Sequence, residues 1–160
     1  MDKLWAPWRI NYIRGKKKKG CIFCIGAKKP EENHVFIKTR HSIAILNTFP
    51  YNSGHVMVCP LRHVKDIEQL SEIEILDLFS TLKKAKKMLT ETLKPEGFNI
   101  GINLSKPAGA GITNHIHIHI VPRWTGDTNF MPTLFSTKVI SQSLEELYKL
   151  LKNAESKRNK

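Results

Sequence analysis

The chain has 160 residues, 41% of them hydrophobic, which is enough for one domain with a substantial core that needs no disulfides. Lysine and arginine outnumber aspartate and glutamate by 26 to 14, so the net charge of +12 favours an anionic partner. Much of the excess lies in runs at 16–19 and 157–160, which are typical of solvated loops and tails. The charge is therefore weak evidence for a nucleic-acid binder.

Four classes of protein fit the sequence poorly. The N-terminus has no apolar run long enough for a signal peptide, and no stretch is suited to spanning a bilayer. Three cysteines, two of them closely spaced, do not suit a disulfide framework. No nucleic-acid reading element or aromatic-basic platform is recognisable. We therefore expect a cytoplasmic protein with no membrane and no specific nucleic-acid partner.

The N-terminal part of the chain predicts an arm and three strands. Residues 1–20 form the arm, which ends in the basic loop. Two β-rich runs, Val35–Thr39 and Ser42–Leu46, are separated by two residues and predict a hairpin. A third strand, His55–Cys59, is expected to stop at Pro60.

A long helix follows these strands. Ser71 and Glu74 have the spacing of a capping box, and the helix is expected to run to about Leu93, before Pro95 and Gly97. Its apolar residues predict one stripe that packs on the core: Ile75, Leu78, Phe79, Leu82, Ala85, Leu89 and Leu93.

The C-terminal part predicts two more strands and a second helix. Strands are expected at Phe98–Asn103 and His115–Val121, the second halted by Pro122, and a helix at about Leu144–Asn153. The loop between the two strands is too short for a crossover helix, so they pair antiparallel. The order of elements predicts an α+β domain over residues 1–160, with an antiparallel sheet, helices on one face and a basic tail at 154–160.

Three histidines at alternate positions, His115, His117 and His119, are the most informative feature of the chain. In a strand their rings share one face, and the isoleucines between them pack behind. A metal site or a polar sheet face is one interpretation. The other is nucleophilic catalysis, in which a neutral imidazole attacks phosphorus while nearby donors hold the phosphoryl oxygens. The glycines at 109 and 111 suit such donors, although a tight loop also needs glycine.

A second pattern, Cys21-Ile-Phe-Cys24, has the spacing at which two thiolates share one zinc ion. A redox motif of this kind is expected near a βαβ unit, which the sequence does not predict. Zinc needs two more ligands, and the chain offers His63 and His115.

The segment His115–Val121 resembles the signature of the histidine triad (HIT) family, His-φ-His-φ-His-φ-φ, where φ is hydrophobic. Asn47 and Gly54-His55-Val-Met-Val match the spacing of the family's upstream motif, and Asn103 lies where the strand before the loop carries Asn or Gln. The resemblance covers roughly 20–125. It implies a HIT-like fold, a homodimer with a purine nucleotide site in each subunit, and nucleotidyl hydrolase or transferase activity through a covalent nucleotidyl-histidine.

The same resemblance implies roles for individual residues. His117 is the nucleophile on the α-phosphorus, His119 contacts the α-phosphate and assists the leaving group, and His55 supports the site. Asn47 matches the ribose position. Phosphate is held by Asn103 and by the loop residues Gly109, Ala110, Gly111, Ile112 and Thr113. Some members carry a structural zinc whose ligands match four residues here: Cys21, Cys24, His63 and His115.

Three further segments resemble one branch of the family. Leu4–Arg9, Ala108–Gly111 and Pro122–Pro132 are similar to bacterial diadenosine tetraphosphate phosphorylases and fragile-histidine-triad hydrolases. We therefore expect a dinucleoside polyphosphate substrate, cleaved by water or by phosphate. Gly111-Ile112 stands where the phosphoramidase branch usually has Gln-Ser, which removes a hydroxyl that reaction would use. A purine nucleoside phosphoramidase and a non-catalytic, zinc-containing nucleotide-binding protein are the alternatives.

Overall fold

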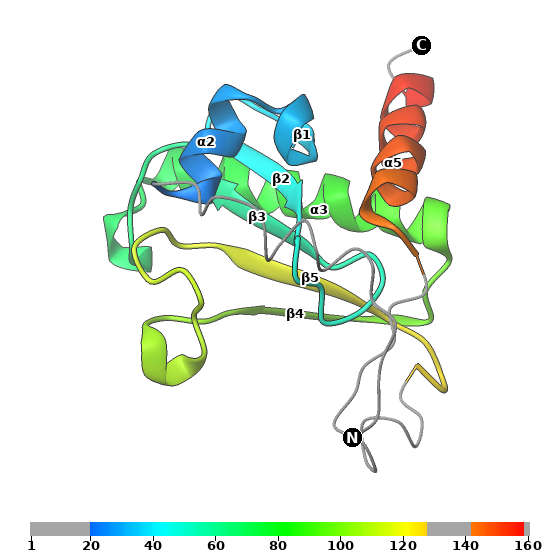
Figure 1. Cartoon of the computed structure of the whole chain (residues 1–160). Coiled ribbons are helices and arrows are strands. Elements are labelled where there is room, and N and C mark those ends of the chain that lie inside the picture. Colours follow the sequence, from blue (N-terminus) through cyan, green and yellow to red (C-terminus); the bar gives the residue numbers. More distant parts are fainter. Residues whose placement is uncertain (1–19, 128–141, 159–160) are drawn as a thin grey trace.

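The computed structural model describes residues 20–127 and 142–158 (Figure 1). The predicted N-terminal arm, its basic loop and the last part of the Pro122–Pro132 motif lie outside these residues. Five strands form one antiparallel sheet in the order β1-β2-β3-β5-β4. Their bounds are β1 Val35–Lys38, β2 Ser42–Leu46, β3 Val56–Pro60, β4 Gly97–Ile102 and β5 Ile118–Arg123. The predicted α+β class and the predicted hairpin are confirmed.

The long helix α3, Glu72–Leu93, begins at the predicted capping box, in which Ser71 Oγ accepts from Glu74 N–H and Glu74 accepts from Ser71 N–H. The C-terminal helix α5, Leu144–Arg158, packs against α3 and β1. It extends beyond the predicted end at Asn153, so most of the predicted tail is helical. Short 3-10 turns lie at Glu31–Asn33, Ile67–Gln69 and Lys106–Ala108.

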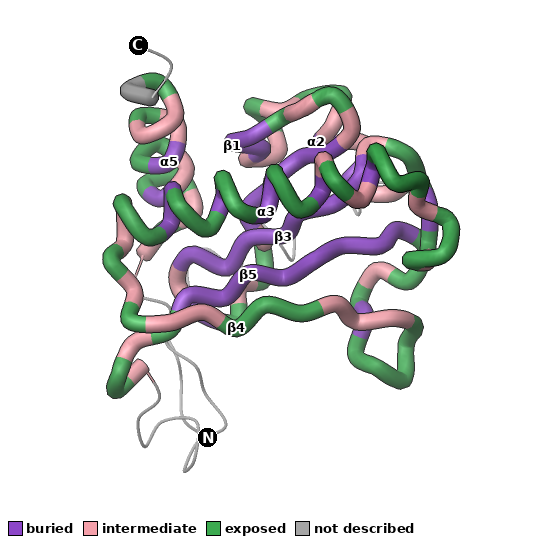
Figure 2. The backbone as a smooth tube through the Cα atoms, turned by 180° about the vertical axis from the view of Figure 1, so that it is seen from behind, coloured by how far each residue is buried: buried purple, intermediate pink, exposed green. Residues whose placement is uncertain are grey.

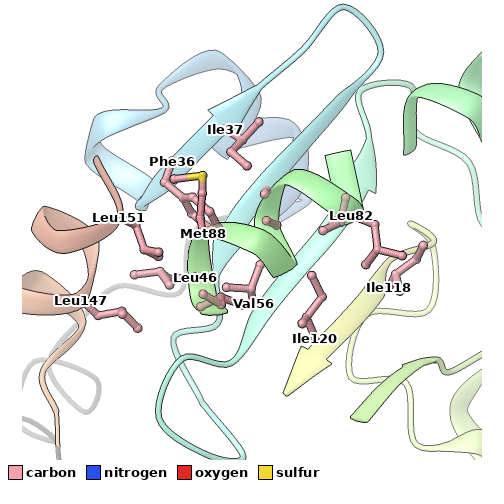
Figure 3. Close-up of a cluster of buried hydrophobic side chains, with 14 of the residues drawn as sticks. Phe36, Ile37, Leu46, Val56, Leu82, Met88, Ile118, Ile120, Leu147 and Leu151 are labelled. Carbon is pink, nitrogen blue, oxygen red and sulfur yellow. The ribbon is translucent and has the colours of Figure 1, made fainter. Parts of the chain in front are cut away.

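The sheet is covered on both faces. One face packs on α3 and α5 through the main core, which Figure 3 shows between those helices and the strands. Alternate residues of β2 and β3 belong to a second cluster on the opposite face, where the short helix α2, Ile22–Lys28, inserts the fully buried Phe23. The prediction of helices on one face only is therefore wrong. It failed because the apolar run in α2 is too short to show a helical period.

The buried stripe of α3 differs from the predicted one. Leu78, Leu82, Ala85 and Leu89 are buried as predicted, but Phe79 is 53% exposed and Met88 is buried instead. At 100° per residue, position 79 lies about 120° from the centre of the buried face, whereas position 88 lies within it. Phe79 is thus hydrophobic but lies outside the face that packs on the core.

The histidine strand also begins and ends later than predicted. The β5 ladder starts at Ile118 and continues through Pro122 to Arg123. Arg123 accepts a hydrogen bond from Glu96 N–H of the chain leading into β4, so the N and O atoms of Pro122 face the other way. There β3 has already ended, at the pair Val56–Ile120, and the missing N–H of Pro122 costs no ladder bond.

The strands differ in how far they are buried. Figure 2 shows β3 and β5 buried along nearly their whole length, while the edge strand β4 and the outer side of α3 are exposed. None of the described helices is both long and apolar enough to cross a membrane. The cytoplasmic location stays a prediction.

Candidate functional site

The three triad histidines are buried on the α2 face of the sheet, with His115 and His117 just before β5 and His119 inside it. Their exposed fractions are 1%, 3% and 9%. Ile118 and Ile120 point into the main core on the opposite face. Phe23 of α2 packs on two of the rings, with ring centroids 5.1 Å from His115 and 4.9 Å from His117. Phe23 is a site residue that was not predicted, although its place inside Cys-x-x-Cys was an available signal.

The ring of His117 has its proton on one defined nitrogen. Its Nδ1 lies 2.9 Å from the carbonyl oxygen of His115, and a carbonyl can only accept, so Nδ1–H is the donor. The neutral ring therefore has its lone pair on Nε2. Burial lowers the pKa of His117, which keeps the ring neutral at neutral pH. This is the state that a nucleophilic imidazole needs.

The protonation of His119 is set by two neighbours in turn. His55, just before β3, is 1% exposed, and its Nδ1 accepts from the backbone N–H of Tyr51 at 3.0 Å. Its proton is therefore on Nε2, which lies 2.8 Å from Nδ1 of His119 and donates to it. His119 in turn has its proton on Nε2. The neutral tautomer of His119 is thus the reverse of that of His117.

Burial keeps this pair of rings neutral. Desolvation, with smaller effects of His119 and His117, lowers the pKa of His55 to about 3. Desolvation and His117 lower the pKa of His119 to about 4. A site with one unprotonated Nε2 and one Nε2–H, on rings whose centroids are 4.8 Å apart, can attack an electrophile and donate to its leaving group at neutral pH.

The turn between β2 and β3 supplies the partners of His55. Asn47 accepts from Phe49 N–H at Oδ1, at 2.9 Å, which directs its amide Nδ2 to His55 Nδ1 at 3.2 Å. The ring of Tyr51 lies over both histidines, with centroids 4.5 Å from His55 and 5.7 Å from His119, and is 55% exposed. Tyr51 was not among the predicted site residues, although an aromatic residue in a polar turn beside His55 was a usable signal.

The predicted phosphate residues lie in the loop between β4 and β5. Asn103 follows β4, and a Cβ on Gly109 would be 3.8 Å from its amide nitrogen, so the two residues are close. Gly109 has φ +90°, a conformation that suits glycine. The amides of Gly109 and Ala110 donate to carbonyls within the loop. Gly111 and Thr113 are exposed, and Ile112 packs on the α2 cluster.

The four predicted metal ligands come together beside the triad. Cys21 and Cys24 lie at the start of α2, His63 follows β3, and His115 precedes β5; their ligand atoms all lie within 4.8 Å of one another. His115 Nδ1 is 3.2 Å from Sγ of Cys21 and 3.7 Å from Sγ of Cys24, and His63 Nδ1 is 3.4 Å from Sγ of Cys24. Bonds of about 2.0–2.3 Å to a tetrahedral zinc put ligand atoms about 3.3–3.8 Å apart. The donor set therefore fits zinc.

His115 is oriented for this role by a backbone carbonyl. Its Nε2–H donates to Pro60 O at 2.9 Å, which leaves the Nδ1 lone pair facing the thiols. Burial lowers the pKa of His115 to about 4, so the ring is neutral, as a ligand must be. Burial and the neighbouring Cys21 raise the pKa of the Cys24 thiol, so a thiolate there requires a compensating cation.

Comparisons with known proteins agree on one family. The model of the HIT domain family matches residues 28–126. The AP-4-A phosphorylase of Mycobacterium tuberculosis is 35% identical over 161 residues, covering 94% of this chain and 83% of the relative. The asymmetrical bis(5'-nucleosyl)-tetraphosphatase of Schizosaccharomyces pombe is 35% identical over 101 residues, covering 63% of this chain and 55% of the relative. Among solved structures, a zinc-bound histidine triad family protein from Mycobacterium smegmatis matches with a TM-score of 0.70 at 25% identity, covering 88% of this chain and 96% of that one.

Proposed function

The chain belongs to the HIT domain family, and we propose that it is an enzyme that cleaves dinucleoside polyphosphates at the α-phosphate through a covalent nucleotidyl-histidine. The observation that carries the proposal is the pair of opposite tautomers. Nε2 of His117 has a lone pair, and Nε2 of the adjacent His119 has a proton. A chain that only bound nucleotides would need neither the buried neutral nucleophile nor the relay from His55 behind its neighbour.

In the first step, the lone pair of His117 Nε2 forms a bond to the α-phosphorus as the bond to the bridging oxygen breaks. The nucleoside polyphosphate leaves with that electron pair, and Nε2–H of His119 donates to the phosphate oxygens as charge develops. The hydrogen bond from His117 Nδ1 to the carbonyl of His115 stabilises the positive ring of the intermediate. Asn103 and residues 109–113 are the proposed phosphate contacts.

In the second step, water or inorganic phosphate attacks the same phosphorus from the side that the leaving group vacated. The P–N bond breaks, its electron pair returns to Nε2 of His117, and the acceptor loses its proton to solvent. The ribose role of Asn47 stays a prediction, since the amide of Asn47 contacts His55 in this structure.

The substrate class rests on the relatives. The AP-4-A phosphorylase and the tetraphosphatase are both named for substrates with two nucleosides joined by a polyphosphate. The match to the phosphorylase covers 94% of this chain and 83% of that relative, whereas the match to the tetraphosphatase covers 63% of this chain and 55% of that relative. Diadenosine tetraphosphate with phosphate as acceptor is therefore the first reaction to test.

Incubation with diadenosine tetraphosphate, with and without inorganic phosphate, tests the proposal. ATP and ADP formed only with phosphate identify a phosphorylase, and ATP and AMP formed without it identify a hydrolase. A nucleoside phosphoramidate is the matched control substrate. Cleavage of the phosphoramidate alone contradicts the proposal and favours the phosphoramidase activity.

We also propose a structural zinc on Cys21, Cys24, His63 and His115. Support comes from the separations of the donor atoms, from the carbonyl that orients His115, and from the zinc-bound relative of similar fold. Four protein ligands leave no open position, so zinc bound there would fix α2 against the segment before β5 and take no part in the reaction.

A homodimer is the proposed assembly. Strand β4 forms one edge of the described sheet, and its Ile100 is 46% exposed. The outer side of α3 exposes Ile73, Leu76 and Phe79, by 65%, 71% and 53%. Apolar side chains in this number on one exposed helix side are typical of an interface. Sedimentation velocity is expected to give twice the 18.3 kDa chain mass; a monomer at micromolar concentration contradicts the proposal.

A further inference from the structure

The turn that supplies the partners of His55 is itself anchored by a buried polar contact. Asn52, near the end of this turn, is 8% exposed. Its Nδ2 donates to Oδ2 of Asp127 at 2.7 Å and to the carbonyl of Pro122 at 3.0 Å. Both acceptors lie in or just after β5, so this one amide connects the turn to the strand that holds His119.

Asp127 is a charged side chain with only 5% of its surface exposed. Its carboxylate accepts from Nε and Nη2 of Arg123 at 2.6 and 2.9 Å, and from Trp124 N–H at 3.2 Å. Nη1 of the same guanidinium donates to Asn99 Oδ1 of β4 at 2.7 Å. A carboxylate fixed by a two-point guanidinium contact has little freedom to move. Asp127 is therefore a rigid anchor for Asn52.

The anchored residue lies beside the groups that set the state of His55. The carbonyl of Asn52 accepts from His55 N–H at 3.1 Å, and the preceding residue, Tyr51, donates its N–H to Nδ1 of the same ring at 3.0 Å. The next glycine, Gly54, has φ +77°, and a Cβ there would lie 2.9 Å from Pro122 Cγ. The turn is thus pressed against β5, with its position fixed by the Asn52 side chain.

We propose that Asn52 and Asp127 are positioning residues for the reaction. By anchoring the turn, they keep Tyr51 N–H, together with the Asn47 amide, on Nδ1 of His55. They so keep the proton of His119 on Nε2, where it donates to the phosphate. Neither residue touches the reacting atoms. The inference rests on the proposed function for its effect on turnover, whereas its effect on the tautomer of His119 stands without any substrate.

The variant Asn52→Ala tests the proposal in two measurements. Long-range ¹H–¹⁵N spectra of histidine-labelled protein are expected to show the two ring nitrogens of His119 moving from separate donor and acceptor shifts toward averaged values. The spectrum of His117, whose tautomer depends on the carbonyl of His115, stays unchanged. The kcat for diadenosine tetraphosphate falls about tenfold while KM changes less than about twofold, because part of a proton donor's contribution is lost.

Asn99→Ala is the matched control, since it removes only the outermost hydrogen bond of the same network and is expected to leave both readouts at the wild-type values. Asp127→Asn is the second variant. It replaces an oxygen surrounded by donors with an NH₂ group. If Asn52→Ala does not fold, the same two measurements are made on Asp127→Asn.

Two outcomes overturn the proposal. One is a folded variant with the wild-type His119 spectrum and wild-type kcat. The other is a fall in kcat with the His119 tautomer retained, which makes the anchor merely structural. If the wild-type protein cleaves no dinucleotide, the proposed function fails, and the spectra still decide whether the anchor sets the tautomer.

Discussion

His115 and His119 are four residues apart on one face of the sheet, yet opposite ring nitrogens of the two residues make the hydrogen bond to the rest of the protein. His115 donates from Nε2 to the carbonyl of Pro60 and turns the lone pair of Nδ1 toward two thiols. His119 accepts at Nδ1 from His55 and holds its proton on Nε2. Both residues are histidines, and each is two residues from His117. The difference lies in what each ring meets on its far side, a carbonyl or another imidazole.

A row of histidines on one face of a strand therefore has no single chemistry. A carbonyl behind a ring always makes that nitrogen a donor and frees the other as a ligand or a nucleophile. Where the partner is another imidazole, the tautomer of that second ring decides which nitrogen of the first ring has the proton. Tyr51 N–H fixes the tautomer of His55, and His55 in turn fixes that of His119. One end of the row therefore suits a metal, the middle a nucleophile and the other end a proton donor.

The largest expected effect is at the middle of the row. His117→Ala removes the proposed nucleophile and is expected to lower kcat for diadenosine tetraphosphate by a factor on the order of 10⁴ or more, as the loss of a nucleophile does elsewhere. Circular dichroism is expected to show the fold intact, and His41→Ala, a histidine outside the row, serves as the control. Turnover near the wild-type rate in His117→Ala contradicts the mechanism.

The next effect is at the metal end and concerns stability. With free zinc at about a thousand times its dissociation constant, binding adds about 4 kcal/mol to the free energy of unfolding. A chelator is therefore expected to lower the Tm of the wild-type protein by about 8–16 °C. Cys24→Ser is expected to hold less than a tenth of an equivalent of zinc and to show no further shift with the chelator.

The metal end and the proton-donor end are expected to respond separately. Chelation leaves the ring spectrum of His119 unchanged, because its partner is His55 and none of the four ligands. Wild-type protein purified without chelators yet free of zinc contradicts the metal proposal. A change in the His119 spectrum on chelation contradicts the separation of the two ends.

The smallest effect is the pH dependence at the proton-donor end. The pKa of His119 is about 4 in the folded chain and that of His55 about 3, against about 6.5 when unfolded. Below about pH 6.5 the unfolded chain therefore binds protons that the folded chain does not bind. The free energy of unfolding decreases as the pH falls below this value. Each ring contributes up to about 1.4 kcal/mol per pH unit.

Urea unfolding at pH 7, 6 and 5 checks this expectation. His119→Asn removes one of the buried rings whose pKa is lowered, and the variant is expected to lose stability less steeply than the wild-type protein, by up to about 1.4 kcal/mol per pH unit. Equal slopes for the variant and the wild-type protein contradict the buried neutral pair.

The local parts of the fold could be predicted because their causes lie within a few residues. The capping box needs only Ser71 and Glu74, and the hairpin needs two β-rich runs with a short gap. The predictions were wrong where a residue or strand far away in the sequence determined the local structure or the burial. Pro122 stays in its strand because β3 has already ended, and Phe79 is exposed because the core lies on the far side of α3.

The candidate site divides in the same way. The alternation of histidine and isoleucine and the Cys-x-x-Cys spacing are visible in the chain, and with the family resemblance they identified every metal and triad residue proposed here. Phe23, Asn52 and Asp127 were not found, because each acts through a contact with a residue far away in the sequence. Tyr51 was missed although its N–H contacts His55, four residues further on.

Which side chains lie on the α2 face follows from the order of residues in the chain, since a period of two residues sends alternate side chains to opposite sides of a strand. What each histidine can do depends on the distant segments that pack against its ring. A ring nitrogen becomes a donor, a ligand or a nucleophile according to the group across from it. For His115, His117 and His119 those groups are the carbonyl of Pro60, the carbonyl of His115 and the ring of His55.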